Sequence, residues 1–128
     1  FSSPLQRAST TAISIIGDSI EIKYDDRLKE RSYGDWSGLD KTSVRDEVGD
    51  EAFLSARRGW DTSPPNGESL KDVSLRVTSF INSLPLAGNI LVVSHGNTIR
   101  AISVILGINT EEEVSSYEIR TGTFLLVK

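Results

Sequence analysis

The chain has 128 residues, and its 14 basic and 18 acidic side chains give a formal net charge of -4. That length suits one compact domain with a real core, and the acidic balance argues against nucleic acid or an anionic membrane as a partner. The sequence has no cysteine, which excludes disulfides, thiol nucleophiles and cysteine metal sites.

The first 60 residues predict helices, one strand and a long loop. In chain order these are a helix that starts at Ser3-Pro4 and stops at Gly17, a half-buried strand over 20–24, a loop over 25–38, a helix from Asp40 to about Val48, and a helix over 50–58. Ser3 supplies a capping hydroxyl, and proline suits the first helical position. The glycine-bearing loop is long enough to carry function.

The second half continues the alternation of helices and strands. It predicts a turn-rich loop over 63–67, a helix from Ser69 to Leu84, a strand over 90–93, a helix after Ser94-His95-Gly96-Asn97 that closes at Gly107, a short helix capped by Thr110 and Glu113, and a strand over 124–127. The run 90–93 is apolar throughout, as in a central strand covered on both faces. We therefore expect a single α/β domain over 1–128, with a three-layer α/β/α architecture and a mostly parallel central sheet.

His95 is the one histidine of the chain, and its position favours a functional role. It follows a predicted central strand, where ligand crevices form in open α/β sheets. Gly96 lets a ligand approach the backbone, and the helix that follows offers free N–H groups to an anion. An imidazole can also donate to a phosphoryl group or carry one near neutral pH.

Several charged residues are candidates for a basic pocket in this acidic protein. Glu30 lies beside an arginine in the long loop and can act as a general acid or base if its pKa is tuned. Arg57 and Arg58 end a predicted helix, where the helix dipole alone is enough to explain positively charged side chains. Arg7 instead lies in the first turn of a helix, where the dipole disfavours a positive charge. Together with Lys41, these arginines suit a small phosphorylated metabolite. No spacing of acidic residues resembles a metal site.

Motifs in this order resemble the histidine phosphatase superfamily and, within it, the cofactor-dependent phosphoglycerate mutases. They are Ser2-Ser3-Pro4-Leu5-Gln6-Arg7-Ala8, Leu28-Lys29-Glu30-Arg31-Ser32-Tyr33-Gly34, Gly38-Leu39-Asp40-Lys41, Arg57-Arg58, Pro64-Pro65-Asn66-Gly67-Glu68-Ser69-Leu70-Lys71-Asp72, Ser94-His95-Gly96-Asn97-Thr98-Ile99-Arg100 and Glu118-Ile119-Arg120-Thr121-Gly122. The resemblance covers essentially the whole chain.

The resemblance implies interconversion of 3-phosphoglycerate and 2-phosphoglycerate through a phosphohistidine, primed by 2,3-bisphosphoglycerate and without a metal. His95 would stabilise the transferring phosphoryl group, Glu30 would exchange the proton of the substrate hydroxyl, and Arg7 would hold the phosphate. The implied set for the rest of the substrate is Arg31, Ser32, Tyr33, Lys41, Arg57, Arg58 and the backbone at Gly96 and Asn97.

The sequence departs from the family in one serious respect, because it contains no Arg-His-Gly motif, which carries the nucleophilic histidine and ends a central strand. The chain also lacks methionine, and we interpret it as having lost its natural N-terminus, with a processed mature protein as the alternative. We expect it to be unable to form the phosphoenzyme and to be poorly stable alone, with unpaired sheet edges. Lesser departures are Ser32, where a bulkier residue is frequent, and Asp40, where asparagine is usual.

Two other functions stay open at this point. One is a phosphomonoester phosphatase of the same superfamily, and the other is a non-catalytic phosphate-binding module. The sequence shows no secretory pattern or membrane-spanning run, so we expect a cytoplasmic protein. It allows a homo-oligomer without specifying one.

Overall fold

Five α-helices and three 3-10 turns make up the regular structure of the computed structural model, which describes residues 1–128. The helices are α1 (Gln6–Ile16), α2 (Lys41–Val48), α3 (Asp50–Arg58), α4 (Leu70–Asn82) and α5 (Gly96–Ile105). The turns are η1 (Asp26–Leu28), η2 (Gly34–Trp36) and η3 (Glu113–Ser115). Every predicted helix is present, although the last is reduced to the single turn η3.

Local side-chain signals explain where α2 and α4 begin. Asp40 caps α2 with its carboxylate. Ser69 and Asp72 form a reciprocal capping box at the start of α4. These two predicted starts are confirmed. The predicted pair of Thr110 and Glu113 also forms, at 3.0 and 3.2 Å, but η3 begins only at Glu113, and no side chain caps it.

The start of α1 differs from the prediction. Its N-cap residue is Leu5, and no side chain caps the helix. The hydroxyl of Ser3 accepts a hydrogen bond from the Leu5 N–H at 3.3 Å, and it lies 2.9 Å from Nε2 of His95. The prediction that Ser3 is the N-cap is therefore wrong, because a long-range contact orients its side chain.

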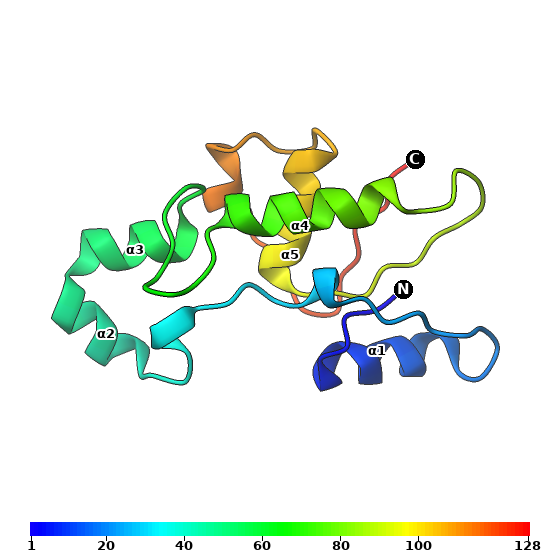
Figure 1. The fold of residues 1–128 in the computed structure, drawn as a ribbon, viewed down its shortest axis with the longest axis horizontal. Helices are drawn as coiled ribbons and strands as arrows, with labels where there is room; N and C mark the ends of the chain where they lie inside the picture. Colours follow the sequence, from blue (N-terminus) through cyan, green and yellow to red (C-terminus); the bar gives the residue numbers. More distant parts are fainter.

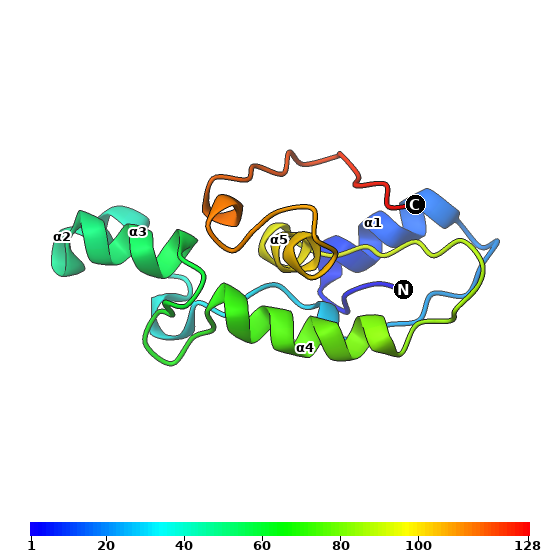
Figure 2. The ribbon, with the colours of Figure 1, turned by 90° about the horizontal axis from the view of Figure 1, so that it is seen from above.

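Extended chain segments lie between α1 on one side and α4 with α5 on the other (Figure 1). The view from above shows α2 and α3 at one end of the molecule, away from α1 (Figure 2). Ala8 and Ala12 of α1 pack against Val93 of an extended segment. On the other side, the ring of Phe1 meets Phe80 of α4 edge-on, with centroids 5.3 Å apart. The contact between α4 and α5 is formed by the buried residues Val73, Val77 and Ala101.

The predicted central sheet is present only as a trace. Ser2 makes parallel bridges to Tyr24 and to Val93, and the segments 20–24, 90–93 and 124–127 form no continuous strand. The segment around Ser2, which lies between segments 20–24 and 90–93, is short, and this limits the pairing. After Ser3 donates its N–H to the carbonyl of Val93 at 2.9 Å, Pro4 has no N–H to offer and the chain turns into α1.

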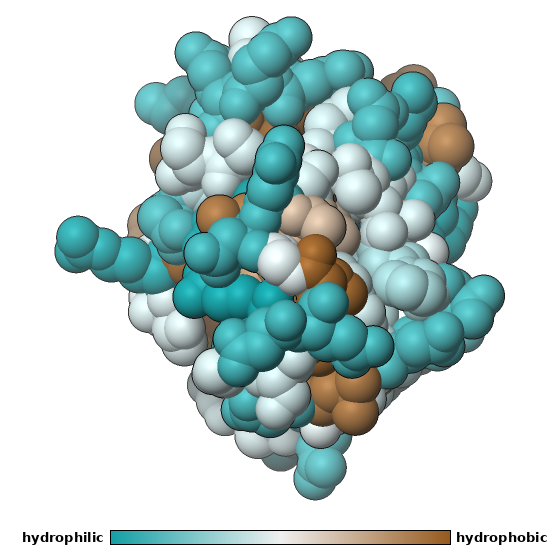
Figure 3. Space-filling view, turned by 90° about the vertical axis from the view of Figure 1, so that its left-hand side faces the viewer, coloured by the Kyte–Doolittle hydropathy of each residue, from teal (hydrophilic) through white to brown (hydrophobic).

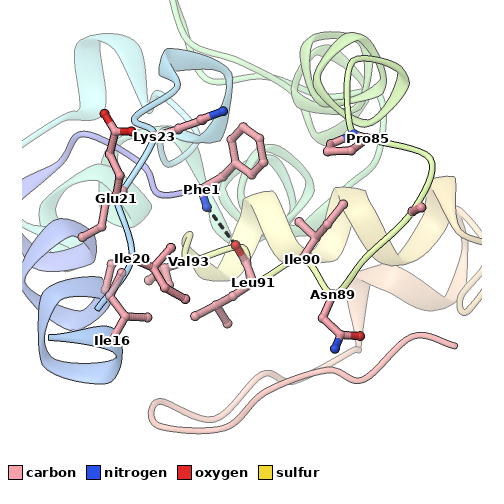
Figure 4. A pocket seen from close by; sticks show the side chains of 13 residues that line it. Phe1, Ile16, Ile20, Glu21, Lys23, Pro85, Asn89, Ile90, Leu91 and Val93 are labelled. Atoms are coloured by element: carbon pink, nitrogen blue, oxygen red, sulfur yellow. Dashed lines mark hydrogen bonds between the residues drawn. The ribbon is translucent and has the colours of Figure 1, made fainter. Parts of the chain in front are cut away.

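An apolar groove opens where the two segments that flank Phe1 diverge (Figure 4). Its volume is about 270 Å³, and its walls include Phe1, Ile16, Ile20, Pro85, Ile90 and Leu91. The last segment of the chain also stays unpaired, and Phe124 is 87% exposed. None of the helices combines the length and the apolar character that a membrane crossing needs.

Candidate active site

His95 is the N-cap residue of α5 and is 7% exposed. Its Nδ1 lies 3.2 Å from Nε of Arg7, and its Nε2 lies 2.9 Å from the hydroxyl of Ser3. Because a guanidinium can only donate, Nδ1 must accept, and the ring proton of the neutral imidazole must be on Nε2. Ser3, Arg7 and His95, which are far apart in the sequence, therefore form one hydrogen-bonded network.

The environment of His95 favours its neutral form. Burial lowers the pKa of His95 below its ordinary value, and the positive charges of Arg7 and Arg76 lower it further, whereas the negative charge of Glu30 raises it. These effects together favour the neutral imidazole, and Glu30 is the one negatively charged group among them.

We expect Arg7→Met to raise the pKa of His95 and Glu30→Gln to lower it further. The first change removes a positive charge that opposes protonation, and the second removes a negative charge that favours it. An NMR titration of the single histidine of this chain measures both shifts. Arg45→Met serves as the control, since Arg45 lies on α2 and pairs with Asp50 at 2.8 Å. Shifts of the same sign in the two test variants would contradict the arrangement.

The backbone before Glu30 is anchored from two helices. The carbonyl of Lys29 accepts hydrogen bonds from the Thr98 hydroxyl at 2.8 Å and from Nη2 of Arg76 at 2.9 Å. The Glu30 carboxylate accepts the N–H of Arg31 at 2.8 Å and is half-buried. This anchoring fixes the backbone that carries the Glu30 carboxylate.

Arg31 is buried, with 2% of its surface exposed. Its guanidinium donates to the carbonyl oxygens of Glu68 at 2.6 Å and of Arg57 at 3.2 Å, and also to those of Ala56 and Thr62. All of these acceptors are backbone atoms, and two of them lie in the last turn of α3. The structure thus gives Arg31 a role in holding loops and helix together, and the substrate contact implied by the resemblance stays a prediction.

The loop that carries Ser32 and Tyr33 is held by backbone contact with the 64–68 loop. Gly34 has a φ of 53°, and a Cβ there would overlap the carbonyl oxygen of Pro65. The carbonyl of Ser32 accepts a hydrogen bond from the N–H of Glu68 at 2.9 Å, and the N–H of Ser32 donates to the Glu68 carboxylate at 2.8 Å. Ser32 is therefore a loop-forming residue in this structure, and Tyr33 is fixed beside it.

Tyr33 connects the His95 region to a second cluster of cations. Its Oη lies 3.3 Å from Nδ2 of Asn97, in the first turn of α5. The guanidinium of Arg57 lies over the rings of both Tyr33 and Phe53, at 5.5 and 5.4 Å from the centroids. A cavity of about 170 Å³ lies beside them, and Lys41 also lines it. Figure 3 views the molecule from this end, where the surface is mainly hydrophilic with a few hydrophobic side chains.

Gly96 leaves room at the start of α5. A Cβ at this position would meet no atom within 4 Å, so the fold does not require glycine there. The His95 side chain does not cap the helix, and the first N–H groups of a helix have no partner within it. The open space and these N–H groups can receive an anion.

Arg58 lies in a different arrangement from its neighbour Arg57. Its Nη1 pairs with the Glu118 carboxylate at 2.8 Å, and this hydrogen bond lowers the pKa of Glu118. Arg100 lies nearby and donates to Oδ1 of Asn97 at 3.1 Å and to the carbonyl of Tyr117 at 2.7 Å. The segment around Glu118 is thereby attached to the site.

The structure therefore brings together most of the predicted residues and adds some that sequence reasoning missed. Arg7 contacts His95 and the charge of Glu30 acts on the same imidazole, while Tyr33, Lys41 and Arg57 line one cavity. Additional residues with contacts to these side chains or to their anchoring backbone include Ser3, Arg76, Thr98, Arg100 and Glu118. No cluster of three or more histidine, aspartate or glutamate residues forms a metal-binding arrangement.

This chain belongs to the histidine phosphatase superfamily (branch 1), which it matches over residues 1–125. Among curated proteins it is similar to the 2,3-bisphosphoglycerate-dependent phosphoglycerate mutases of Methylobacterium radiotolerans and Mesorhizobium japonicum, at 39% identity in each case. The alignments include 100% and 95% of this chain but 65% and 64% of the relatives. The chain thus spans about 65% of the length of the mutase from Methylobacterium radiotolerans.

Solved structures show the same fold and include phosphatases. A mycobacterial glucosyl-3-phosphoglycerate phosphatase in complex with inorganic phosphate matches with a TM-score of 0.77 and 29% identity, over 91% of this chain and 62% of that one. The Bacillus stearothermophilus protein YhfR matches with a TM-score of 0.80 and 25% identity, over 98% of this chain and 69% of that one.

Proposed function

We propose that the protein carrying this chain is a phosphoglycerate mutase, which interconverts 3-phosphoglycerate and 2-phosphoglycerate through a phosphohistidine, a reaction of glycolysis and gluconeogenesis. The observation that carries the proposal is the grouping of a cation and a carboxylate around one buried imidazole, since Arg7 contacts His95 at 3.2 Å and the charge of Glu30 acts on the same ring. The similarity to curated mutases supports it.

Arg7 and Glu30 have direct parts in the proposed reaction. The two amino groups of Arg7 make no hydrogen bond or ion pair within the chain, because its Nε alone contacts His95, and they bind the transferring phosphate. Glu30 takes the proton of the substrate hydroxyl when the phosphoryl group arrives and returns it when the group leaves. In this proposal His95, the one histidine of the sequence, assists the transfer and is not the nucleophile. The nucleophilic histidine is therefore not among these residues.

The second cluster suits the substrate carboxylate. Neither Lys41 nor Arg57 forms an ion pair within the chain, although seven such pairs form elsewhere in the molecule. Two unpaired cations beside one cavity fit a multiply charged anion such as 2,3-bisphosphoglycerate. When bound, that compound supplies the phosphoryl group that primes the enzyme.

An assay of the protein that carries the chain tests this function. We expect isomerisation of 3-phosphoglycerate that depends on added 2,3-bisphosphoglycerate. Release of inorganic phosphate without isomerisation would show a phosphatase instead, and binding of phosphate without either reaction would show a non-catalytic module.

The phosphatase is the second candidate because a specific feature favours it. The cavity beside Arg57 has aromatic walls from Trp36 and Phe53, whose rings stack at 5.9 Å. Such a cavity can hold a leaving group larger than glycerate. The phosphatases among the similar solved structures support this alternative.

Arg57→Gln is expected to raise the Michaelis constant for 3-phosphoglycerate roughly 10- to 100-fold, since a hydrogen bond to a charged group contributes about 1.5–3 kcal/mol. Steady-state kinetics with a full substrate titration measures the change. Arg120→Gln, which changes an exposed arginine whose guanidinium has no hydrogen-bond or ion-pair partner in the chain, is the matched control. An unchanged Michaelis constant for Arg57→Gln would remove this residue from the substrate pocket.

A further inference from the structure

Ser3 is fully buried, and its hydroxyl contacts the one imidazole of the chain. It lies 2.9 Å from Nε2 of His95, across 92 positions of sequence. The backbone of this segment is fixed on both sides, because Ser2 donates its N–H to the carbonyl of Lys23 and Ser3 donates its N–H to the carbonyl of Val93, each at 2.9 Å. The hydroxyl is therefore held in place before any ligand binds.

The two contacts of the imidazole are consistent with only one arrangement of its proton. If Ser3 donated to Nε2, the neutral ring would carry its proton on Nδ1, where it would face the Nε–H of Arg7 at 3.2 Å. Two donors would then point at each other. With the proton on Nε2, Ser3 accepts and Arg7 donates, so both contacts are satisfied.

We propose that Ser3 is a positioning residue that holds His95 in the Nε2–H tautomer and thereby orients Arg7 for anion binding. The proposal rests on the function proposed above, in which Arg7 binds the transferring phosphate. With the ring fixed, Nδ1 anchors Nε of Arg7, and the guanidinium plane is fixed in turn. The two free amino groups then present a preformed fork to phosphate oxygens.

The neighbouring serine provides a matched control. Ser2 and Ser3 are both fully buried, but the hydroxyl of Ser2 donates to the carbonyl of Ser3 at 3.0 Å and does not contact His95. Ser2→Ala and Ser3→Ala therefore remove the same atom from adjacent buried positions. Ser3→Thr keeps the hydroxyl, and Ser3→Cys keeps the volume with a much weaker acceptor.

Nitrogen-15 NMR of the imidazole in the full 128-residue chain tests the proposal, because the sequence has a single histidine. We expect one neutral tautomer, Nε2–H, in the original chain, in Ser2→Ala and in Ser3→Thr. We expect loss of that single tautomer in Ser3→Ala and Ser3→Cys, together with weaker binding of inorganic phosphate by calorimetry. Thermal unfolding of all variants shows whether the fold is kept.

The possible outcomes separate this proposal from the function on which it rests. An Nε2–H tautomer that persists in both Ser3→Ala and Ser3→Cys, or an original chain with the proton on Nδ1, would overturn the positioning role. Loss of the tautomer with unchanged phosphate binding would overturn the link to Arg7. Absence of mutase activity in the protein that contains this chain would overturn the proposed function and leave the tautomer result unaffected.

Discussion

In the protein that contains this chain, Glu30→Gln is expected to lower the turnover of the isomerisation by roughly 10²- to 10⁴-fold, which is the usual contribution of a general acid or base. The amide is nearly the same size as the carboxylate but cannot take up a proton. The anchoring of the preceding carbonyl by Thr98 and Arg76 does not involve the Glu30 side chain, so the backbone should remain in place. The loss should therefore fall on turnover.

Rapid-quench measurement of the phosphoenzyme separates this effect from a general loss of activity. We expect phosphoryl transfer from 2,3-bisphosphoglycerate to be slowed but not abolished in Glu30→Gln, because the oxygen that leaves the phosphorus takes its proton from Glu30, whereas a disrupted site would form no phosphoenzyme at all. Glu47→Gln, an exposed change on α2, should leave turnover unaltered. Full isomerisation by Glu30→Gln would exclude the acid/base role.

Arg31→Met is expected to lower the free energy of unfolding by about 3 kcal/mol, because it removes several hydrogen bonds from a charged donor and leaves buried carbonyl groups without partners. The guanidinium contacts backbone oxygens in the 62–68 loop and in the last turn of α3. Its loss should loosen the connection between the α2–α3 hairpin and the rest of the molecule.

Urea unfolding followed by circular dichroism measures this change, with Arg45→Met as an exposed control expected to shift stability by less than about 1 kcal/mol. The same variants also distinguish the two roles of Arg31. If Arg31→Met kept its stability but lost affinity for 3-phosphoglycerate, the substrate contact implied by the sequence resemblance would be correct and the structural role of Arg31 would be wrong.

Local signals in the sequence were sufficient for the starts of α2 and α4. Ser69 with Asp72 and Asp40 before α2 act within a few residues, so their side chains determine the helix starts whatever surrounds them. Strands depend on partners far away in the chain. The apolar run 90–93 has strand character, but it meets only the short Phe1–Ser3 segment, and a strand without a continuous partner does not form a ladder.

The same distinction applies to the site. The residue types of Arg7, Glu30 and His95 and their order in the chain could be identified from the sequence. The contact of Ser3 with His95 could not, because a serine before a proline is locally indistinguishable from a helix cap. Arg31 illustrates the converse, since a motif arginine beside a catalytic candidate gives no sign that its donors are used by backbone carbonyls.

The pairing of Arg58 with Glu118 has a consequence for how the site responds to ionic strength. A carboxylate or phosphate that binds Arg58 must first displace a partner belonging to the protein, so binding there loses an internal ion pair. Added salt screens the internal pair and the incoming anion alike. The attraction of an anion by Arg58 should therefore vary less with salt than its attraction by Lys41 or Arg57, because neither of these two cations has an ion-pair partner within the protein.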